Sequence, residues 1–298
     1  MRENNNEQNG IYYGITNCTK RDMVVCKSRP LLNLTKSDLS LLELKLLDLY
    51  LARINPKNDE RDIVVFEKPE LEKMLHVKRI DSRRLEAALE HLTGYVVTLF
   101  LEPKHKKHLT LFAQAELEYE DEARNTTPTI RLQCNPLIKQ YIFHPDTIGY
   151  LRSNIYRVTS FRTRHAYCLY QYIGQNKFRG EWTVSISTLK AYMGLAGHYD
   201  NFKDFKRDVL KPAIQEVKKK TGMEIGFNLV RKNRKAQGLR FFLWHDDEST
   251  KYAEPTENAD EGLLNNPKEK VQTLSEIGQG LLFHSSSRLW ITFCSKRI

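Results

Sequence analysis

The segment 199–221 constrains the fold more than any other stretch of this chain, because it predicts an amphipathic helix with one basic face. Its apolar residues recur at spacings of three and four, which gives a helix one face to bury. They are Phe202, Phe205, Val209, Ala213 and Val217. The other face is cationic and carries Lys203, Lys206, Arg207 and Lys211. We expect Pro212 to bend or re-cap the helix midway.

Long cationic side chains on an exposed helix face favour a DNA-recognition helix. The alternative is a solvated amphipathic helix, because Asp204 and Asp208 dilute the positive field. The residues that follow favour the first interpretation. Residues 223–230 and 238–244 are β-rich and flank seven residues of which four are basic, so they predict a hairpin with a cationic tip.

The segments upstream complete a known order of elements. Residues 156–173 have helical periodicity, 182–184 are a short β-like run, and 187–193 predict another helix, closed by Gly194. Helix, short strand, helix, basic helix and hairpin is the order of a winged helix. In this variant of the helix-turn-helix, the recognition helix enters the major groove and the hairpin, or wing, touches the flanking backbone.

The N-terminal half repeats this order with little sequence identity. A leucine-rich helix over 35–54 begins with Thr35-Lys-Ser-Asp38, which resembles a capping box. The other expected elements are a strand over 62–66, helices over 69–75 and 79–92, and a hairpin formed by 95–101 and 109–115 around the basic tip 104–108. The repeated order predicts two winged-helix units in tandem.

We therefore expect an α+β fold of two tandem winged-helix domains, which are helix-turn-helix variants, with a disordered C-terminal tail. The expected parts are a flexible N-terminus over 1–22, winged-helix domain 1 over 23–122, a linker over 123–150, winged-helix domain 2 over 151–245, and an acidic, largely disordered tail over 246–298. Within the tail, residues 280–293 are apolar enough to form a short strand or helix that docks elsewhere.

The charge of the chain favours a polyanionic partner. Residues 246–298 hold six Lys and Arg against nine Asp and Glu, a net charge of −3, so residues 1–245 carry +13 and the whole chain +10. Because this surplus is concentrated in two wings and two helices, it favours duplex nucleic acid over a membrane surface. Composition alone leaves RNA open.

The sequence does not predict a membrane or secreted protein. No stretch approaches the ~20 apolar residues of a membrane span, and the polar start lacks the core of a signal peptide, so we expect a cytoplasmic protein with no membrane partner. The five cysteines are odd in number and include no Cys-x-x-Cys pair, which predicts neither a disulfide framework nor a zinc site.

We expect no enzymatic activity, no catalytic residue, no cofactor and no metal. The chain has no Gly-x-x-x-x-Gly-Lys-Ser/Thr phosphate loop, and its nine histidines form no His-apolar-His pair of the kind that nicking enzymes use. His105 and His108 lie among lysines, where repulsion disfavours a cation. The acidic run 116–122 could suggest a two-metal nuclease, but a solvated strand end leading into a linker explains it better.

Several blocks resemble a known family. In the first half these are 24–28, 34–47 and 52–56. In the second half they are Tyr156, Arg164, Tyr167, Leu169, Tyr170, Trp182, Leu189, Met193, Gly194 and the most specific block, Tyr199-x-x-Phe202-x-x-Phe205-Lys206-Arg207-x-Val209-Leu210-x-Pro212-Ala213-x-x-Glu216. With them, roughly residues 22–245 resemble the iteron-binding replication initiators of theta-replicating plasmids, the first half more loosely.

This resemblance implies that monomers bind direct repeats in the double-stranded DNA of a plasmid origin and melt or mark an adjacent AT-rich region. It implies host helicase, initiator and polymerase proteins as partners. It also implies a monomer–dimer equilibrium in which dimers repress the protein's own gene. The second domain would supply most of the sequence reading, and the first would add DNA contacts in the monomer and a dimer interface otherwise.

The resemblance also suggests which residues contact DNA. The leading set is Lys203, Lys206, Arg207 and Lys211, with Arg231, Lys232, Arg234 and Lys235 of the second wing on the backbone. The first-domain set is Arg79, Ser82, Arg83 and Arg84, with Lys104, Lys106 and Lys107 of the first wing. For Lys206 and Arg207 the alternative is an intradomain salt bridge with Asp204 or Glu216. We expect Trp182, Tyr199, Phe202 and Phe205 to belong to the core.

A rival function is a sequence-specific transcriptional repressor with tandem winged-helix domains and no role in replication. The sequence barely separates the two, because both need only tandem DNA readers. A nuclease or relaxase is a more distant third.

Overall fold

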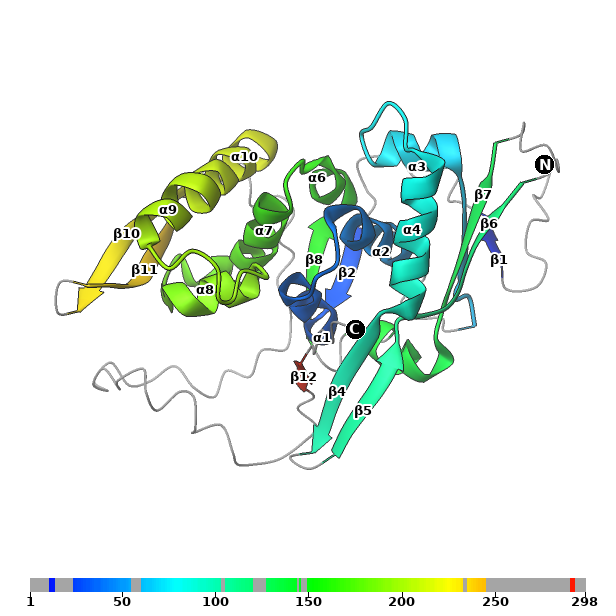
Figure 1. The fold of residues 1–298 in the computed structure, drawn as a ribbon, viewed down its shortest axis with the longest axis horizontal. Coiled ribbons are helices and arrows are strands. Elements are labelled where there is room, and N and C mark those ends of the chain that lie inside the picture. The colour runs from blue at the N-terminus through cyan, green and yellow to red at the C-terminus, as the bar shows by residue number, and fades with distance from the viewer. Residues whose placement is uncertain are drawn as a thin grey trace. The chain divides into compact units, whose positions relative to one another are not determined.

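The computed structural model describes residues 11–13, 24–54, 60–102, 105–119, 127–143, 145, 149–232, 235–244 and 290–292 (Figure 1). The expected N-terminal segment 1–22 lies outside the described residues except for β1 (Ile11–Tyr13). The expected tail 246–298 also lies outside them, except for β12 (Trp290–Thr292). β12 pairs antiparallel with the first wing, so a short strand does form within the apolar stretch 280–293.

The first winged-helix unit follows the expected order of helix, strand, helix, helix and wing. Its elements are α2 (Leu41–Arg53), β3 (Ile63–Glu67), α3 (Lys68–Met74), α4 (Ser82–Gly94), β4 (Val96–Glu102) and β5 (His105–Thr110). β4 and β5 pair antiparallel and form the wing. The apolar stripe of α4 that periodicity selects is buried, namely Leu85, Ala88, Leu89 and Leu92.

Further strands extend this unit. β3 lies in a sheet of order β1-β3-β7-β6 with β6 (Phe112–Glu118) and β7 (Thr129–Cys134). A second pair joins β2 (Val24–Ser28) to β8 (Tyr150–Asn154). The segment 123–150 that we expected as a linker therefore contains β7, and also α5 (Lys139–Ile142). The alternating residues Ile130, Leu132 and Cys134 of β7 are fully buried.

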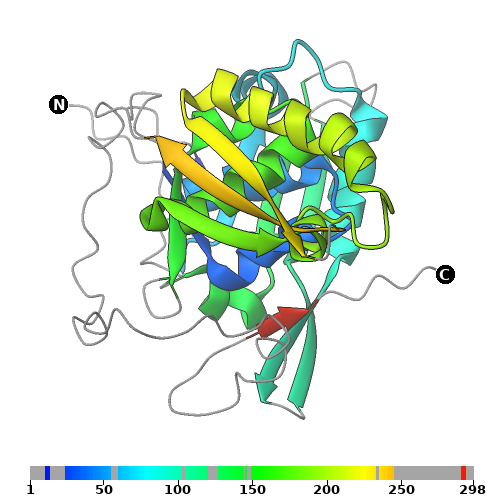
Figure 2. The ribbon, with the colours of Figure 1, turned by 90° about the vertical axis from the view of Figure 1, so that its left-hand side faces the viewer.

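The second unit has the same order. Its elements are α6 (Ile155–Ser160), α7 (Arg164–Asn176), β9 (Glu181–Ser185), α8 (Ile186–Tyr192), the recognition helix, β10 (Glu224–Lys232) and β11 (Lys235–Trp244). The recognition helix is α9 (Phe202–Phe205), a π-helical turn (Lys206–Leu210) and α10 (Lys211–Thr221). β9, β10 and β11 form one antiparallel sheet of order β10-β11-β9, beside the recognition helix (Figure 2).

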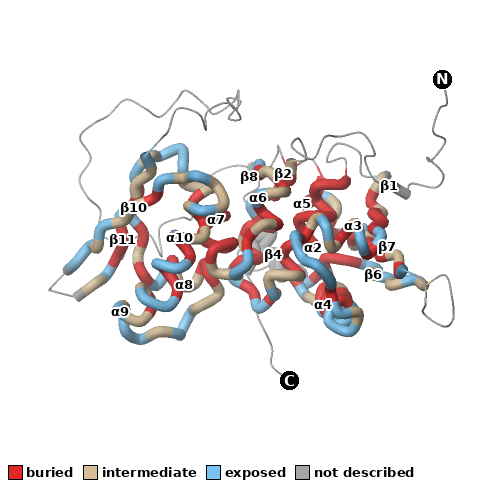
Figure 3. Tube along the Cα trace, turned by 90° about the horizontal axis from the view of Figure 1, so that it is seen from above, coloured by how far each residue is buried: buried red, intermediate tan, exposed pale blue. Residues whose placement is uncertain are grey.

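A continuous cluster of buried apolar side chains runs through both units (Figure 3). α7 lies in the middle of it and buries Tyr167, Leu169 and Ile173 completely. In the second unit Trp182 stacks on Phe241, with ring centroids 5.5 Å apart. Burial of this kind is the main source of folding free energy, so the two units share one stabilising core.

Two expected helix boundaries were wrong. α2 begins at Leu41 rather than near Thr35, because the capping box is formed by Ser40 and Glu43: each accepts a hydrogen bond from the other's backbone N–H, at 3.4 and 2.6 Å. The helix expected over 156–173 is divided into α6 and α7. Thr163 caps α7 by accepting a hydrogen bond from the Ala166 N–H at 3.2 Å, which starts a new helix there.

The first wing also differs from expectation. The strand expected over 109–115 is divided between β5, which pairs with β4, and β6, which pairs with β7. The basic residues 105–108 lie in β5 rather than at the hairpin tip. The acidic residues Glu116 and Glu118 are exposed at the end of β6, as a solvated strand end predicts.

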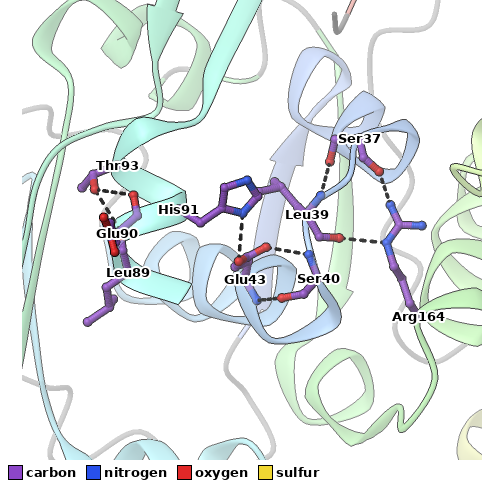
Figure 4. Close-up of polar contacts among 9 residues, drawn as sticks. All are labelled: Ser37, Leu39, Ser40, Glu43, Leu89, Glu90, His91, Thr93 and Arg164. Atoms are coloured by element: carbon purple, nitrogen blue, oxygen red, sulfur yellow. Dashed lines mark hydrogen bonds and ion pairs between the residues drawn. The ribbon is translucent and has the colours of Figure 1, made fainter. Parts of the chain in front are cut away.

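Arg164 joins the two units through backbone carbonyls, and Figure 4 shows its hydrogen bonds to those of Ser37 and Leu39. Its Nε donates to the Leu39 carbonyl at 2.8 Å, and its Nη1 donates to the Met193 carbonyl at 2.7 Å. Its Nη2 donates to the carbonyls of Thr35 and Ser37 at 2.9 and 2.5 Å. One guanidinium therefore binds the segment before α2 in the first unit and the end of α8 in the second.

Gly194 leaves the space that this guanidinium occupies. Its φ is +71°, in the left-handed region that side chains rarely adopt. A Cβ at this position would lie 2.8 Å from Arg164 Nη1 and 3.1 Å from the Ser37 carbonyl oxygen. The closing glycine of α8 is thus required both by the turn and by the approach of Arg164.

We predict that Gly194→Ala destabilises the protein more than Gly197→Ala does. Gly197 has a similar φ of +77° but no atom within 4 Å of the added Cβ, so its substitution adds only backbone strain of about 1–2 kcal/mol. Gly194→Ala also disturbs the hydrogen bonds of the Arg164 guanidinium, which lowers the free energy of unfolding further, by about 1–3 kcal/mol. Urea unfolding of both variants measures the difference, and equal losses would contradict the role assigned to Gly194.

Candidate nucleic-acid interface

The recognition helix contains a proline, and its regular hydrogen bonding is interrupted before that residue. The Asn201 side chain caps its start by accepting a hydrogen bond from the Lys203 N–H at 2.9 Å. Pro212 has no N–H, and its ring would clash with the carbonyl four residues earlier in a regular helix. The π-helical turn Lys206–Leu210 ends two residues before Pro212 and widens the helix there. Gly222, with φ of +72°, ends the helix.

The expected division of this helix into two faces is present. Phe205, Val209, Ala213 and Val217 are buried. Tyr199 and Phe202 are half-buried and pack against the core, while Trp182 is buried. On the solvent side lie the cations, with Lys203, Arg207 and Lys211 exposed and Lys206 half-buried. We call these four side chains the basic ridge.

Arg207 already holds carboxylates in the unbound protein. Its Nε and Nη2 donate to the two carboxylate oxygens of Asp208 at 2.6 and 2.8 Å, and Nη2 lies 3.1 Å from Asp204. The hydrogen bond from Arg207 lowers the pKa of the Asp208 carboxyl. The side chain of Arg207 is 65% exposed, so these pairs are screened by water and salt. An incoming base or phosphate can therefore compete with Asp208 for the guanidinium of Arg207.

The other expected salt-bridge partner has a different role. Glu216 accepts hydrogen bonds from the Thr163 hydroxyl at 2.7 Å and from the Arg162 N–H. It thus fastens α10 to the start of α7. The Lys206 ammonium lies 5.8 Å from the centre of the Phe227 ring, over its face, which orients this cation beside β10.

The second wing extends from the same unit. Lys232 and Lys235 pair across its tip, and Arg231 is exposed one residue before them. Arg234 lies outside the described residues, as does Lys104 of the first wing. Lys106 and Lys107 lie in β5, opposite Phe100 and Leu99.

The first-unit candidates surround the start of α4. Arg79 lies in the turn before the helix, and Arg83 and Arg84 lie in its first turn; all three are exposed. Asp81 caps the helix by accepting from the Arg84 N–H at 3.0 Å. Ser82 accepts a hydrogen bond from the Lys68 ammonium at 2.9 Å, so its hydroxyl already has a partner.

Three cations near these arginines were missed by sequence reasoning. Lys45 of α2, Arg162 before α7 and Lys220 of α10 line the same pocket as Arg79 and Arg84. No local pattern marks them, because each belongs to a different element and only the tertiary fold brings them together.

Among the described residues, no group of three or more His, Cys, Asp or Glu side chains is arranged to hold a metal ion. None of the helices in that part of the chain combines the length and apolar character needed to cross a bilayer.

Two family models match most of this chain. The model for the initiator replication protein WH1 matches residues 24–174, and the model for the initiator Rep protein WH2 matches residues 185–243. None of the curated proteins compared with the chain matches it.

A solved structure has a similar fold. The Pi initiator protein, solved in complex with iteron DNA, is similar with a TM-score of 0.63 and 22% sequence identity, over 77% of this chain and 100% of that one. At this identity the similarity concerns the fold alone. RctB domains 2-3 are a weaker match, with a TM-score of 0.42 and 10% identity over 73% of this chain and 83% of that one.

Proposed function

This chain belongs to the family of initiator replication proteins, and we propose that it initiates plasmid replication by binding direct repeats, or iterons, in double-stranded origin DNA. The observation that carries the proposal is that both winged-helix models of the family match the chain, at residues 24–174 and 185–243. In addition, the basic ridge of the recognition helix lies on its solvent side. The fold shared with the Pi initiator, solved with iteron DNA, supports it.

The groups of cations have different tasks in this proposal. Arg207 can donate two hydrogen bonds from its guanidinium to the O6 and N7 atoms of guanine, once the base displaces the Asp208 carboxylate. Lys203, Lys206 and Lys211 neutralise phosphates beside it. Arg231, Lys232, Arg234 and Lys235 of the second wing contact the flanking backbone. Arg79, Ser82, Arg83, Arg84 and the first-wing lysines Lys104, Lys106 and Lys107 add contacts from the first unit.

We further propose that the protein acts in the cytoplasm and recruits host helicase and initiator proteins to DNA that it has bound. In this proposal monomers bind the iterons, and dimers repress the protein's own gene. The protein itself catalyses no step. Its contribution is to mark the origin and to place the host proteins there.

We predict that the purified protein protects several direct repeats near its own gene. Footprinting at roughly physiological salt suits the test, because nonspecific binding weakens steeply with ion concentration. Repeats spaced by whole helical turns and close to an AT-rich tract would support an initiator. A single inverted repeat at the promoter would instead indicate the repressor, and no protection at this salt would contradict both.

We predict that Arg207→Ala relaxes sequence preference. Losing a bidentate contact to guanine lowers the discrimination between cognate and altered repeats by about 1–3 kcal/mol. The measurement is a titration of the variant with iteron DNA and with the same DNA altered at single base pairs.

Lys211→Ala is the matched control on the same face. Removing a phosphate contact weakens binding to all sequences alike and lowers the salt slope by about 1. If Arg207→Ala behaves in this uniform way too, Arg207 does not read a base.

A further inference from the structure

Five cationic side chains from both units surround a pocket of about 910 Å³. They are Lys45, Arg79, Arg84, Arg162 and Lys220. They come from α2, the turn before α4, α4 itself, the turn between α6 and α7, and the end of α10. We call this the cationic pocket. The position of these elements can be followed in Figure 1.

Negative charge in this pocket is sparse. Asp81 is the acidic residue in its lining, and its carboxylate accepts a hydrogen bond from the Arg84 N–H. Burial lowers the pKa of His76, the remaining titratable group of the lining, which favours its neutral form. Among the described residues, none of the five cationic side chains forms an ion pair. The lining therefore gathers five cationic side chains against one carboxylate.

Lys45 is the most unusual of the five. It is only 7% exposed, yet its ammonium has no hydrogen-bond or ion-pair partner in the described part of the chain. Burial of a charged group without a partner is unfavourable. Burial lowers the pKa of Lys45 to about 8, with Lys220 acting in the same direction and Glu216 opposing it. At pH 7 the ammonium is still charged, so an anion in the pocket would relieve this penalty.

The nearest acid on the same helix is committed elsewhere. Asp48 is fully buried, and it pairs with Lys27 and accepts a hydrogen bond from the Tyr167 hydroxyl at 2.7 Å. Glu216 is held by Thr163 and by the Arg162 N–H. Both carboxylates act on Lys45 only through their charge, and neither forms a hydrogen bond or ion pair with its ammonium in the described part of the chain.

The rest of the lining strengthens the attraction. Leu41, Leu42, Leu75, Ile80 and Phe161 give the pocket an apolar wall. Charges interact more strongly beside such a wall than in bulk water.

We propose that the cationic pocket binds a phosphate group, supplied in the DNA complex by the duplex backbone. The DNA source rests on the function proposed above, and free phosphate is the other source of the same chemistry. Two observations favour the backbone: Arg79 and Arg84 lie at the start of the first unit's α4, and Lys220 ends the recognition helix that carries the basic ridge. A phosphate held there contacts both units at once.

Thermal unfolding with inorganic phosphate tests the pocket without DNA. At pH 7 and constant ionic strength, replacing chloride with phosphate should raise the Tm of the wild type by about 2–4 °C once phosphate exceeds its dissociation constant several-fold. Lys45→Met should lose this rise, and it keeps the length of the buried side chain, so folding is preserved. Lys219→Met is the control: this exposed lysine of α10 does not line the pocket, and its variant should keep the rise.

The salt dependence of duplex binding distinguishes the two sources. If a backbone phosphate occupies the pocket, Lys45→Met lowers the slope of log K against log salt by about 0.9, and Lys219→Met leaves it unchanged. A lost Tm rise with an unchanged slope would assign the pocket to free phosphate. An unchanged Tm rise and an unchanged slope in Lys45→Met would overturn the proposal. Absence of DNA binding by the wild type would contradict the proposed function, and the Tm experiment would still decide whether the pocket binds phosphate.

Discussion

The hydrogen bonds of Arg164 connect the two halves of this molecule. Its guanidinium has only donors, and it binds four backbone carbonyls, three before α2 and one after α8. The Thr35 carbonyl also accepts a hydrogen bond from the Cys168 thiol at 3.8 Å, so a second side chain of α7 contacts the same segment. The close approach is possible because Gly194 has no side chain and adopts a left-handed conformation. Hydrogen bonds from a charged donor are stronger than neutral ones, so those of Arg164 hold the two winged-helix units firmly together; we call this contact the joint.

A second contact, one helical turn later in α7, strengthens the joint. Tyr167 donates a hydrogen bond to Asp48 of α2 and accepts one from Lys27 of β2, both at 2.7 Å. All three residues are buried. Because a buried ion pair is expensive to break, this group fixes α7 against the first unit. The basic ridge and the cationic pocket are therefore presented on one body, which suits a protein that must contact DNA with both units.

Sequence reasoning succeeded where the signal is local. The apolar stripes of α4 and the recognition helix, the short strands β3 and β9 and the second hairpin all follow from patterns within one segment. The interruption of the regular α-helix before Pro212 was also predictable, since proline does not fit the interior of a regular helix. The family resemblance was predicted from the block around Phe205, Arg207 and Pro212, and the family models confirm it.

The failures have two physical causes, a choice between competing local caps and contacts that form only on folding. The start of α2 depends on which of several serines and threonines forms the N-cap. Ser40 forms it because the Glu43 carboxylate, three residues later, accepts a hydrogen bond from the Ser40 N–H and completes a capping box. The sequence did not predict the strand β7, which lies within the expected linker, because the pairing of β7 with β3 and β6 is non-local. The cationic pocket could not be found because Lys45, Arg162 and Lys220 meet only after folding. Whether the expected DNA contacts touch DNA stays a prediction.

The most direct test of the joint is amide hydrogen exchange in wild type and Arg164→Met. We predict that residues 37–44 and 189–195 lose protection together in this variant, since both segments contact the same guanidinium. Arg157→Met, which alters an exposed arginine of α6, should leave both segments protected. Loss of protection in only one of the two segments would contradict the claim that Arg164 couples the two winged-helix units.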